Sequence, residues 1–175
     1  MLKRFIPTYH AKTIYEIDFN FFLTLGIKLI ISDLDNTLDA FDTYTPSAEA
    51  LEFARKCEEN NIQLAIISNN HSERVYNYAK GMHVDFISSA MKPFSHKVLK
   101  YIYACKINLE HVIMIGDQTV TDVACGNSAK VMTVLTDKYV ERDQPTTKFN
   151  RILDKRIRKL LEKKKLLKDW RKYYE

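Results

Sequence analysis

Two aspartates separated by one residue follow the most apolar segment of the sequence. Asp33 and Asp35 lie in the stretch IISDLDNTLDAF (30–41), just after the apolar run IKLIIS (27–32). Such a run is typical of a buried strand, and two carboxylates beside it repel each other and lose hydration. Two interpretations are therefore open: a structural turn that happens to be acidic, or a catalytic pair.

Further polar clusters follow three other apolar runs. IQLAIIS (62–68) leads into a serine and two asparagines, a lysine stands a few residues after VDFIS (84–88), and two aspartates follow HVIMIG (111–116). The residues concerned are Ser68, Asn69, Asn70, Lys92, Asp117 and Asp122. Because the carboxyl ends of parallel strands meet at one edge of a sheet, we expect these side chains to lie close to the first aspartate pair.

Three acids in one cleft repel each other unless a cation lies among them. Oxygen ligands of this kind favour Mg²⁺, which binds through few carboxylates and keeps several waters. Lys92, Ser68 and free backbone N–H groups would suit a phosphoryl group brought in by the metal. The cluster therefore predicts a Mg²⁺ site at which a phosphoryl group binds.

Five short apolar runs, rich in β-branched residues, predict the strands of the fold. They are 27–32, 62–68, 84–88, 111–116 and 130–135, and helical patterns stand between them. Thr45 and Ser72 are the expected N-caps of the first two helices, and Gly81 is the expected C-cap of the second. Strands that alternate with helices predict an α/β fold, a three-layer sandwich around a central parallel, Rossmann-like sheet.

The four polar clusters, in this order, resemble the four motifs of the haloacid dehalogenase (HAD) superfamily. DLDNTL (33–38) is similar to motif I, DxDxT or DxDxV, and GDQTVTD (116–122) is similar to motif IV, GDxxxxD. Ser68 stands in the place of motif II and Lys92 in the place of motif III. Each motif alone is weak, but together they give a strong resemblance, because each follows the strand that this fold requires.

The resemblance implies a phosphatase that works through an aspartyl-phosphate. Asp33 would be the nucleophile that attacks phosphorus, and Asp35 would protonate the leaving oxygen and later activate the hydrolytic water. Mg²⁺ would be held by the carboxylate of Asp33, the backbone carbonyl of Asp35 and Asp117, with Asp122 as a direct or more distant ligand. The phosphate-binding residues would be Leu34, Asn36, Thr37, Ser68, Asn69 and Lys92.

A narrower resemblance covers nearly the whole chain. SNNHSERV (68–75), AMKP (90–93), GDQTVTDVACGN (116–127) and TTKFNRILDKRI (146–157) are similar to the YqeG-like branch of HAD subfamily IIIA. That branch is related to phosphatases of phosphatidylglycerophosphate, which implies a phosphorylated lipid as the substrate. Only 35 residues separate Asp33 from Ser68, and 24 separate Ser68 from Lys92, so we expect no large cap domain.

Basic charge is concentrated at the end of the chain. Residues 148–175 hold twelve Lys/Arg and four Asp/Glu, a net charge of +8, whereas the preceding residues have a net charge of −3. We therefore divide the chain into a phosphatase domain (1–147, with an N-terminal extension over 1–26) and a basic amphipathic helix (148–175). Its apolar stripe would be Phe149, Leu153, Ile157, Leu160 and Leu167.

This C-terminal helix could pack on the domain with a solvated charged face, or contact anionic lipid at a membrane surface. Nucleic acid is an unlikely partner, because no base-stacking aromatic pattern accompanies the charge. Three cysteines without CxxC spacing favour a reducing compartment. No signal peptide or membrane span is expected, so we predict a cytoplasmic protein, at the inner face of the membrane if its C-terminal helix contacts lipid.

Each motif also has a structural reading. Asp117 could be a simple helix N-cap and Lys92 an ordinary surface lysine, while Asn70 and Arg74 could be helix-start and surface residues. Two other functions stay open: a phosphate-binding or receiver module without turnover, and a phosphatase of soluble sugar or nucleotide phosphates. The five histidines share no metal-ligand spacing.

Overall fold

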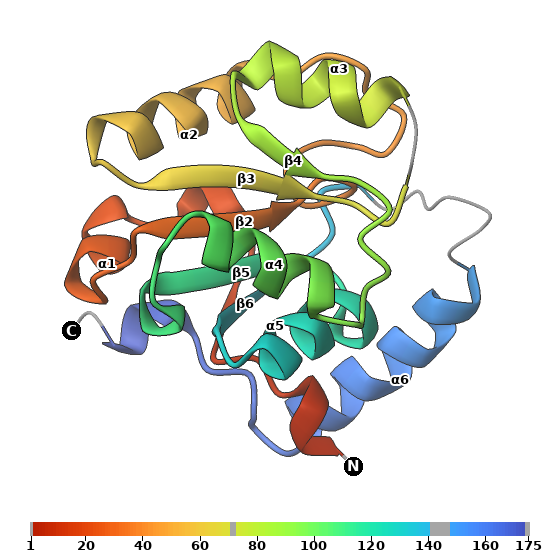
Figure 1. The fold of residues 1–175 in the computed structure, drawn as a ribbon. Helices are drawn as coiled ribbons and strands as arrows, with labels where there is room; N and C mark the ends of the chain where they lie inside the picture. Colours follow the sequence, from red (N-terminus) through yellow and green to blue (C-terminus); the bar gives the residue numbers. More distant parts are fainter. Residues whose placement is uncertain (1, 71–72, 141–147, 174–175) are drawn as a thin grey trace.

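Six parallel strands form the central sheet of the protein (Figure 1). The computed structural model describes residues 2–70, 73–140 and 148–173. Across the sheet, the strand order is β1-β6-β5-β2-β3-β4. The strands are β1 (Tyr9–Ala11), β2 (Leu29–Asp33), β3 (Gln63–Ile67), β4 (Asp85–Ile87), β5 (Val112–Gly116) and β6 (Met132–Thr136). The last five of these lie within about two residues of the apolar runs that predict them.

Helices cover both faces of the sheet. They are α1 (Phe19–Thr24), α2 (Ala48–Glu59), α3 (Glu73–Met82), α4 (His96–Ala104), α5 (Ala124–Ala129) and α6 (Lys148–Lys163). On β2, Ile30 packs in one hydrophobic cluster with Phe53 of α2, while Leu29 and Ile31 pack in another with Val98 of α4. Alternate residues of a strand point to opposite faces, so a strand buried on both faces needs a continuous apolar run. The predicted three-layer α/β sandwich is confirmed.

The sheet order has a switch point between β2 and β5. The chain runs from β2 to β3 and β4 on one side, then returns to place β5 and β6 on the other side. In open parallel sheets, ligands bind at such a point, outside the carboxyl ends of the strands. In the part of the chain that the structure describes, no separate cap domain covers these strand ends, as predicted. The switch point therefore places the ends of β2 and β5 side by side.

The N-terminal segment is part of the sheet rather than an extension beside it. β1 pairs with β6 in parallel, with Tyr9 opposite Val134. Phe21 and Phe22 of α1 are buried in the main hydrophobic cluster. The segment 1–26, expected as an N-terminal extension of the domain, thus supplies a strand of the sheet and part of the core. A strand of three residues, paired with a segment more than 120 residues away, leaves almost no local signal in the sequence.

Two helix ends differ from the predicted caps. Ser47, not Thr45, is the N-cap of α2, and its hydroxyl accepts a hydrogen bond from the backbone N–H of Ala50 at 3.2 Å. At the end of α3 the left-handed residue is His83, with φ of 56°, rather than Gly81. The predicted N-cap Ser72 lies outside the described residues. The N-cap of α2 and the left-handed residue after α3 thus each lie two residues from the predicted position.

The C-terminal helix is shorter than predicted and buries a different face. α6 ends at Lys163, and a 3₁₀ helix (Trp170–Tyr173) follows. The ring of Trp170 packs edge-on against that of Phe21, with 5.5 Å between the ring centroids. The buried residues on the inner side of α6 are Asp154, Ile157 and Leu161. Of the predicted stripe, Ile157 is buried and Leu167 is half-buried, whereas Leu153 and Leu160 are 42% and 40% exposed. The side chain of Phe149 lies outside the described part of the structure.

Candidate active site

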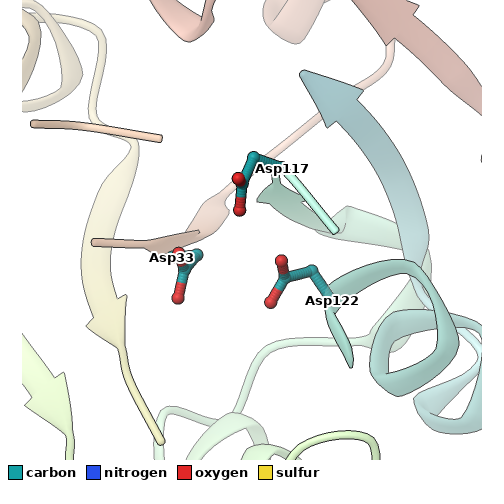
Figure 2. Close-up of side chains that lie close together, drawn as sticks. All are labelled: Asp33, Asp117 and Asp122. Carbon is teal, nitrogen blue, oxygen red and sulfur yellow. The ribbon is translucent and has the colours of Figure 1, made fainter. Parts of the chain in front are cut away.

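Three aspartates meet at the switch point of the sheet. Asp33 is the last residue of β2, Asp117 directly follows β5, and Asp122 lies in a short π-helical segment, Thr119–Val123. One carboxylate oxygen of each lies within 4.8 Å of the other two, and all three side chains are buried. Figure 2 shows the three carboxylate groups around a common space. Asp117 is thus not merely a helix cap, because its carboxylate belongs to this acidic cluster.

A glycine makes the close approach of Asp122 possible. A Cβ atom on Gly116 would lie 2.4 Å from both Cβ and Cγ of Asp122, far inside van der Waals contact. One carboxylate oxygen of Asp122 accepts a hydrogen bond from the backbone N–H of Gln118 at 3.0 Å. The GDQTVTD segment therefore folds back so that its last aspartate faces its first. A side chain at position 116 would collide with Asp122, so this position of the motif requires glycine, which the sequence pattern alone does not reveal.

Lys92 neutralises part of the acidic cluster. Its buried Nζ donates to Asp33 Oδ1 at 2.5 Å and to Asp122 Oδ1 at 2.7 Å. The side chain of Asn69 fixes the backbone of this lysine, because its Oδ1 accepts from Lys92 N at 2.7 Å and its Nδ2 donates to Lys92 O at 3.1 Å. Lys92 is therefore a buried counter-charge and not a surface lysine. The carboxamide of Asn69 is a support for Lys92 that the sequence did not indicate.

Burial and neighbouring charges shift the pKa values of Asp33, Asp117 and Lys92. Burial raises the pKa of Asp33 well above its usual value, with Lys92 acting against it and the neighbouring acids adding to it. In the same way burial raises the pKa of Asp117 to about 7, although Arg151 offsets part of the effect. Burial alone lowers the pKa of Lys92, but Asp122 and Asp33 outweigh it, so this pKa is raised. Three acids so poorly solvated favour the addition of positive charge.

One oxygen of Asp117 meets the conditions for a metal ligand. Its Oδ2 pairs with Arg151, but its Oδ1 is buried and has no hydrogen-bond partner among the described residues. A buried carboxylate oxygen without a partner is costly unless something outside the protein binds it. Oxygen donors only, three carboxylates and a small space are the conditions that a hard divalent cation such as Mg²⁺ requires. The residues present therefore fit this cation.

The second aspartate of the first motif has a different partner. Asp35 is partly exposed and forms an ion pair with Arg74 of α3, whose buried guanidinium also donates to the backbone carbonyl of Thr43 at 2.8 Å. Burial raises the pKa of Asp35, and Arg74 acts in the opposite direction. Arg74 is therefore not a surface residue, since it ties α3 to the loop that follows β2. The sequence left this role open.

The loop after Asp33 is a tight turn. Asn36 has a left-handed backbone with φ of 64°, which asparagine tolerates better than most residues. The N–H of Asn36 donates to Asp39 O at 2.7 Å, and that of Leu38 donates to Leu34 O at 3.1 Å. The side chain of Leu34 is buried in the hydrophobic core, so that only its backbone can reach a ligand. Thr37 is also buried, and no described residue is a partner of its hydroxyl.

Ser68 lies directly after β3 and is buried. Its hydroxyl accepts a hydrogen bond from the backbone N–H of Asn70 at 3.0 Å, and its own N–H donates to Ile87 O at 2.9 Å. Asn70 therefore shapes the turn that holds Ser68. The carbonyl of Asn70 also accepts from the N–H of Ser89 at 3.2 Å, which joins this turn to the loop that carries Lys92.

Three residues of α6 contact the site, and sequence reasoning did not identify them. Arg151 Nη1 donates to Asp117 Oδ2 at 2.6 Å, and Arg158 donates to the backbone carbonyl of the same aspartate. Asp154 Oδ1 accepts from the N–H and the hydroxyl of Thr119 at 2.5 and 2.7 Å. Their spacing of three and four residues in NRILDKRI would mark one face of a helix, but it does not say what that face contacts.

The fold is shared with solved phosphatase structures. The cobalt-bound deoxy-D-mannose-octulosonate 8-phosphate phosphatase (YrbI) from Haemophilus influenzae matches with a TM-score of 0.51 and 16% identity, over 65% of this chain and 80% of that one. A structure described as a putative 3-deoxy-D-manno-octulosonate 8-phosphate phosphatase from Vibrio cholerae matches with a TM-score of 0.50 and 15% identity, over 82% and 92%. A family model described as HAD-hydrolase-like matches residues 89–161. These likenesses define the fold as HAD-like.

A relative of similar length narrows the assignment. "Probable phosphatase YqeG" of Bacillus subtilis (strain 168) is 32% identical over 165 residues, which cover 94% of this chain and 96% of that protein. The chain thus belongs to the HAD superfamily, in its YqeG-like branch, and is a phosphatase of that superfamily. Phosphorylated molecules are accordingly its substrates.

Proposed function

We propose that the protein hydrolyses phosphomonoesters through a covalent aspartyl-phosphate, with Mg²⁺ bound by the acidic cluster. The observation that carries the proposal is the arrangement of Asp33, Asp117 and Asp122 around one space, with Lys92 as a counter-charge. Asp117 Oδ1 supplies a ligand atom that has no other described partner. Asp33, the backbone carbonyl of Asp35, Asp117 and Asp122 would hold the cation.

In the first step, a carboxylate oxygen of Asp33 attacks phosphorus and the bond to the ester oxygen breaks. The leaving oxygen takes a proton from Asp35, and the burial that raises the pKa of this carboxyl group favours its protonated form. Ser68 and the backbone N–H groups of the turn would hold the phosphoryl oxygens, and Lys92 would hold Asp33 in line. The bound cation would neutralise charge on the phosphoryl oxygens.

In the second step, water attacks phosphorus of the aspartyl-phosphate and gives a proton to Asp35. The bond between phosphorus and the Asp33 oxygen breaks, so that inorganic phosphate leaves and both aspartates return to their starting states. Arg74 pairs with Asp35 and would keep this side chain at the mouth of the site during both transfers. Turnover without loss of either carboxylate separates this function from that of a phosphate-binding module.

Removal of divalent cations tests the metal requirement. We expect EDTA to abolish hydrolysis of p-nitrophenyl phosphate, and Mg²⁺ added in excess to restore it, because three buried carboxylates with one lysine cannot also hold an anionic phosphoryl group. Thermal unfolding with and without Mg²⁺ gives a second readout, since a ligand that binds only the folded state raises its stability. Full activity after exhaustive chelation would contradict the proposal.

For the physiological substrate, we propose a phosphorylated lipid at an anionic membrane surface. Among the described residues, no helix is long and apolar enough to cross a membrane. The outer face of α6 nevertheless exposes Ile152 at 57%, together with Leu153 and Leu160, between basic residues. These exposed basic residues are Lys155, Arg156, Lys159 and Lys163. An amphipathic helix of this composition suits the interface of an anionic bilayer, where each basic residue contributes about 1 kcal/mol.

Exposed apolar residues also lie next to residues of the site in the sequence. Phe94 and Met91, on the loop that carries Lys92, are 61% and 55% exposed. Arg151, at the start of α6, contacts Asp117, so the exposed apolar residues Ile152 and Leu153 lie next to a residue of the site. An open site with an apolar border favours a phosphate carried on a large or lipidic molecule over a soluble sugar or nucleotide phosphate.

Vesicle binding tests the lipid proposal. We expect the protein to bind vesicles that contain phosphatidylglycerol and not vesicles of phosphatidylcholine alone, as measured by flotation. Leu160→Glu should weaken this binding about tenfold or more, since it removes an exposed leucine that would enter the bilayer and adds a negative charge. Leu51→Glu, an equally exposed leucine on α2, is the matched control. Preference for soluble sugar phosphates over phosphatidylglycerophosphate in a direct assay would overturn the lipid substrate.

A further inference from the structure

Arg151, Asp154 and Arg158 of α6 form hydrogen bonds with the loop that carries Asp117. Arg158 Nη2 donates to the carbonyl of Thr136 at 2.6 Å and also to that of Asp117. Asp154 accepts two hydrogen bonds from Thr119, and the Arg158 side chain donates to its second oxygen at 3.1 Å. These contacts join α6 to the ends of β5 and β6. A helix near the end of the chain is therefore built into the catalytic edge of the sheet.

Among the described residues of α6, Arg151 contacts a carboxylate of the acidic cluster. It donates to Asp117 Oδ2 at 2.6 Å, and its side chain is only 10% exposed, while that of Asp117 is not exposed at all. The other oxygen of this carboxylate, Oδ1, has no described partner, and Asp117 is a member of the acidic cluster. A carboxylate held through one oxygen cannot rotate freely, so its second oxygen keeps a fixed direction.

We propose that Arg151 is a positioning residue of this phosphatase: it binds Oδ2 of Asp117 and thereby directs Oδ1 toward Asp33 and Asp122, where the cation binds. This inference rests on the proposed function, because it assumes that Asp117 is a metal ligand. It adds a residue from α6 to the site and gives the start of the basic helix a role in the metal centre, separate from any role of its outer face at a membrane.

An alternative is that Arg151 takes the place of the cation and competes with it. The contacts argue against this role. Arg151 binds Oδ2 of Asp117, whereas the basic side chain that pairs with Asp33 and Asp122 within the cluster is Lys92. The guanidinium binds Oδ2 of Asp117 and leaves Oδ1, the other oxygen of this carboxylate, without a described partner. Supporting hydrogen bonds of this kind to a metal ligand are worth about 10–100-fold in metal affinity.

The test compares Arg151→Ala and Arg151→Lys with the wild type. We expect the Mg²⁺ concentration for half-maximal hydrolysis of p-nitrophenyl phosphate to rise about 10–100-fold in Arg151→Ala, and excess Mg²⁺ to restore most of the rate. Mn²⁺ binding, followed by electron paramagnetic resonance without substrate, should weaken by the same factor. Arg151→Lys keeps a donor and a positive charge, so its half-maximal Mg²⁺ concentration should lie between those of the wild type and Arg151→Ala. Added methylguanidinium should partly restore Mg²⁺ binding to Arg151→Ala.

Arg55→Ala is the matched control. Arg55 is an exposed arginine on α2 that also pairs with carboxylates, those of Glu52 and Glu59, but it has no contact with the site. Thermal unfolding of each variant reports any loss of fold. Unchanged or tighter Mn²⁺ binding in folded Arg151→Ala would overturn the proposal, as would a raised KM for substrate that excess Mg²⁺ does not correct. A wild type that neither binds Mn²⁺ nor needs Mg²⁺ would instead refute the proposed function itself.

Discussion

Asp33→Asn is expected to reduce hydrolysis of p-nitrophenyl phosphate by about 10⁴-fold or more, which is the scale of loss when a covalent nucleophile is removed. Asparagine has the same shape as aspartate but cannot form the acyl phosphate under these conditions. The variant should remain folded, because Lys92 keeps its second partner, Asp122. Steady-state rates, with circular dichroism to check the fold, measure this prediction.

A companion variant separates the roles of the two aspartates. Asp35→Asn keeps the nucleophile, and an aryl phosphate has a leaving group that needs little protonation. The first step should therefore proceed while the second stalls, giving a burst of nitrophenolate close to one equivalent of enzyme. After acid quench, the phosphoryl group should be found on the peptide that contains Asp33.

Asp85→Asn is a suitable control, since this aspartate lies on β4 and pairs with Tyr101 away from the cluster. Activity of Asp33→Asn within tenfold of the wild type would exclude the covalent route. A burst without phosphoryl transfer to that peptide would exclude Asp33 as the nucleophile.

Lys92→Met is expected to lower the free energy of unfolding by about 3–5 kcal/mol in the absence of divalent cations, because it leaves buried carboxylates without their counter-charge. Methionine keeps the volume of the side chain, so lost packing contributes little. Saturating Mg²⁺ should raise the free energy of unfolding more in this variant than in the wild type, since a bound cation supplies the missing positive charge. Urea unfolding with and without Mg²⁺ measures both effects.

Lys100→Met provides the comparison for this experiment. Lys100 lies on α4 and is exposed, so its replacement should change the free energy of unfolding by less than about 0.5 kcal/mol. A Lys92→Met protein as stable as the wild type without Mg²⁺ would show that the three aspartates are not ionised together around this lysine. Hydrolysis should also fall sharply in Lys92→Met, because Asp33 loses the group that holds it in line.

Local patterns in the sequence were sufficient for most of the sheet. The strands β2 to β6 lie in short apolar runs rich in β-branched residues, because a sheet covered on both faces buries most of its side chains. The polar residues after these runs were then expected at one edge, and Asp33, Lys92, Asp117 and Asp122 do lie together there. β1 was not predicted, since its partner β6 lies far along the chain and its three residues carry no periodic signal.

The basic C-terminal helix shows the limit of periodicity. Its stripe placed Leu153 and Leu160 inward, whereas the structure buries Asp154 and exposes both leucines. From sequence alone, an aspartate on a helix is expected to face solvent unless a buried partner is known. The buried partner of Asp154 is Thr119, 35 residues away in the sequence. The same applies to Arg74, whose burial follows from an ion pair with Asp35 across 39 residues.

The α/β class and the residues that form the acidic edge follow from the sequence alone, because parallel strands bring their carboxyl ends together whatever the details of packing. The contacts that hold these residues are visible only in three dimensions: Gly116 against Asp122, Asn69 bonded to Lys92, and Arg151 bonded to Asp117. Such supports join segments far apart in the chain. Their physical cause is the need to pair buried polar groups, which depends on three-dimensional proximity and leaves no local pattern.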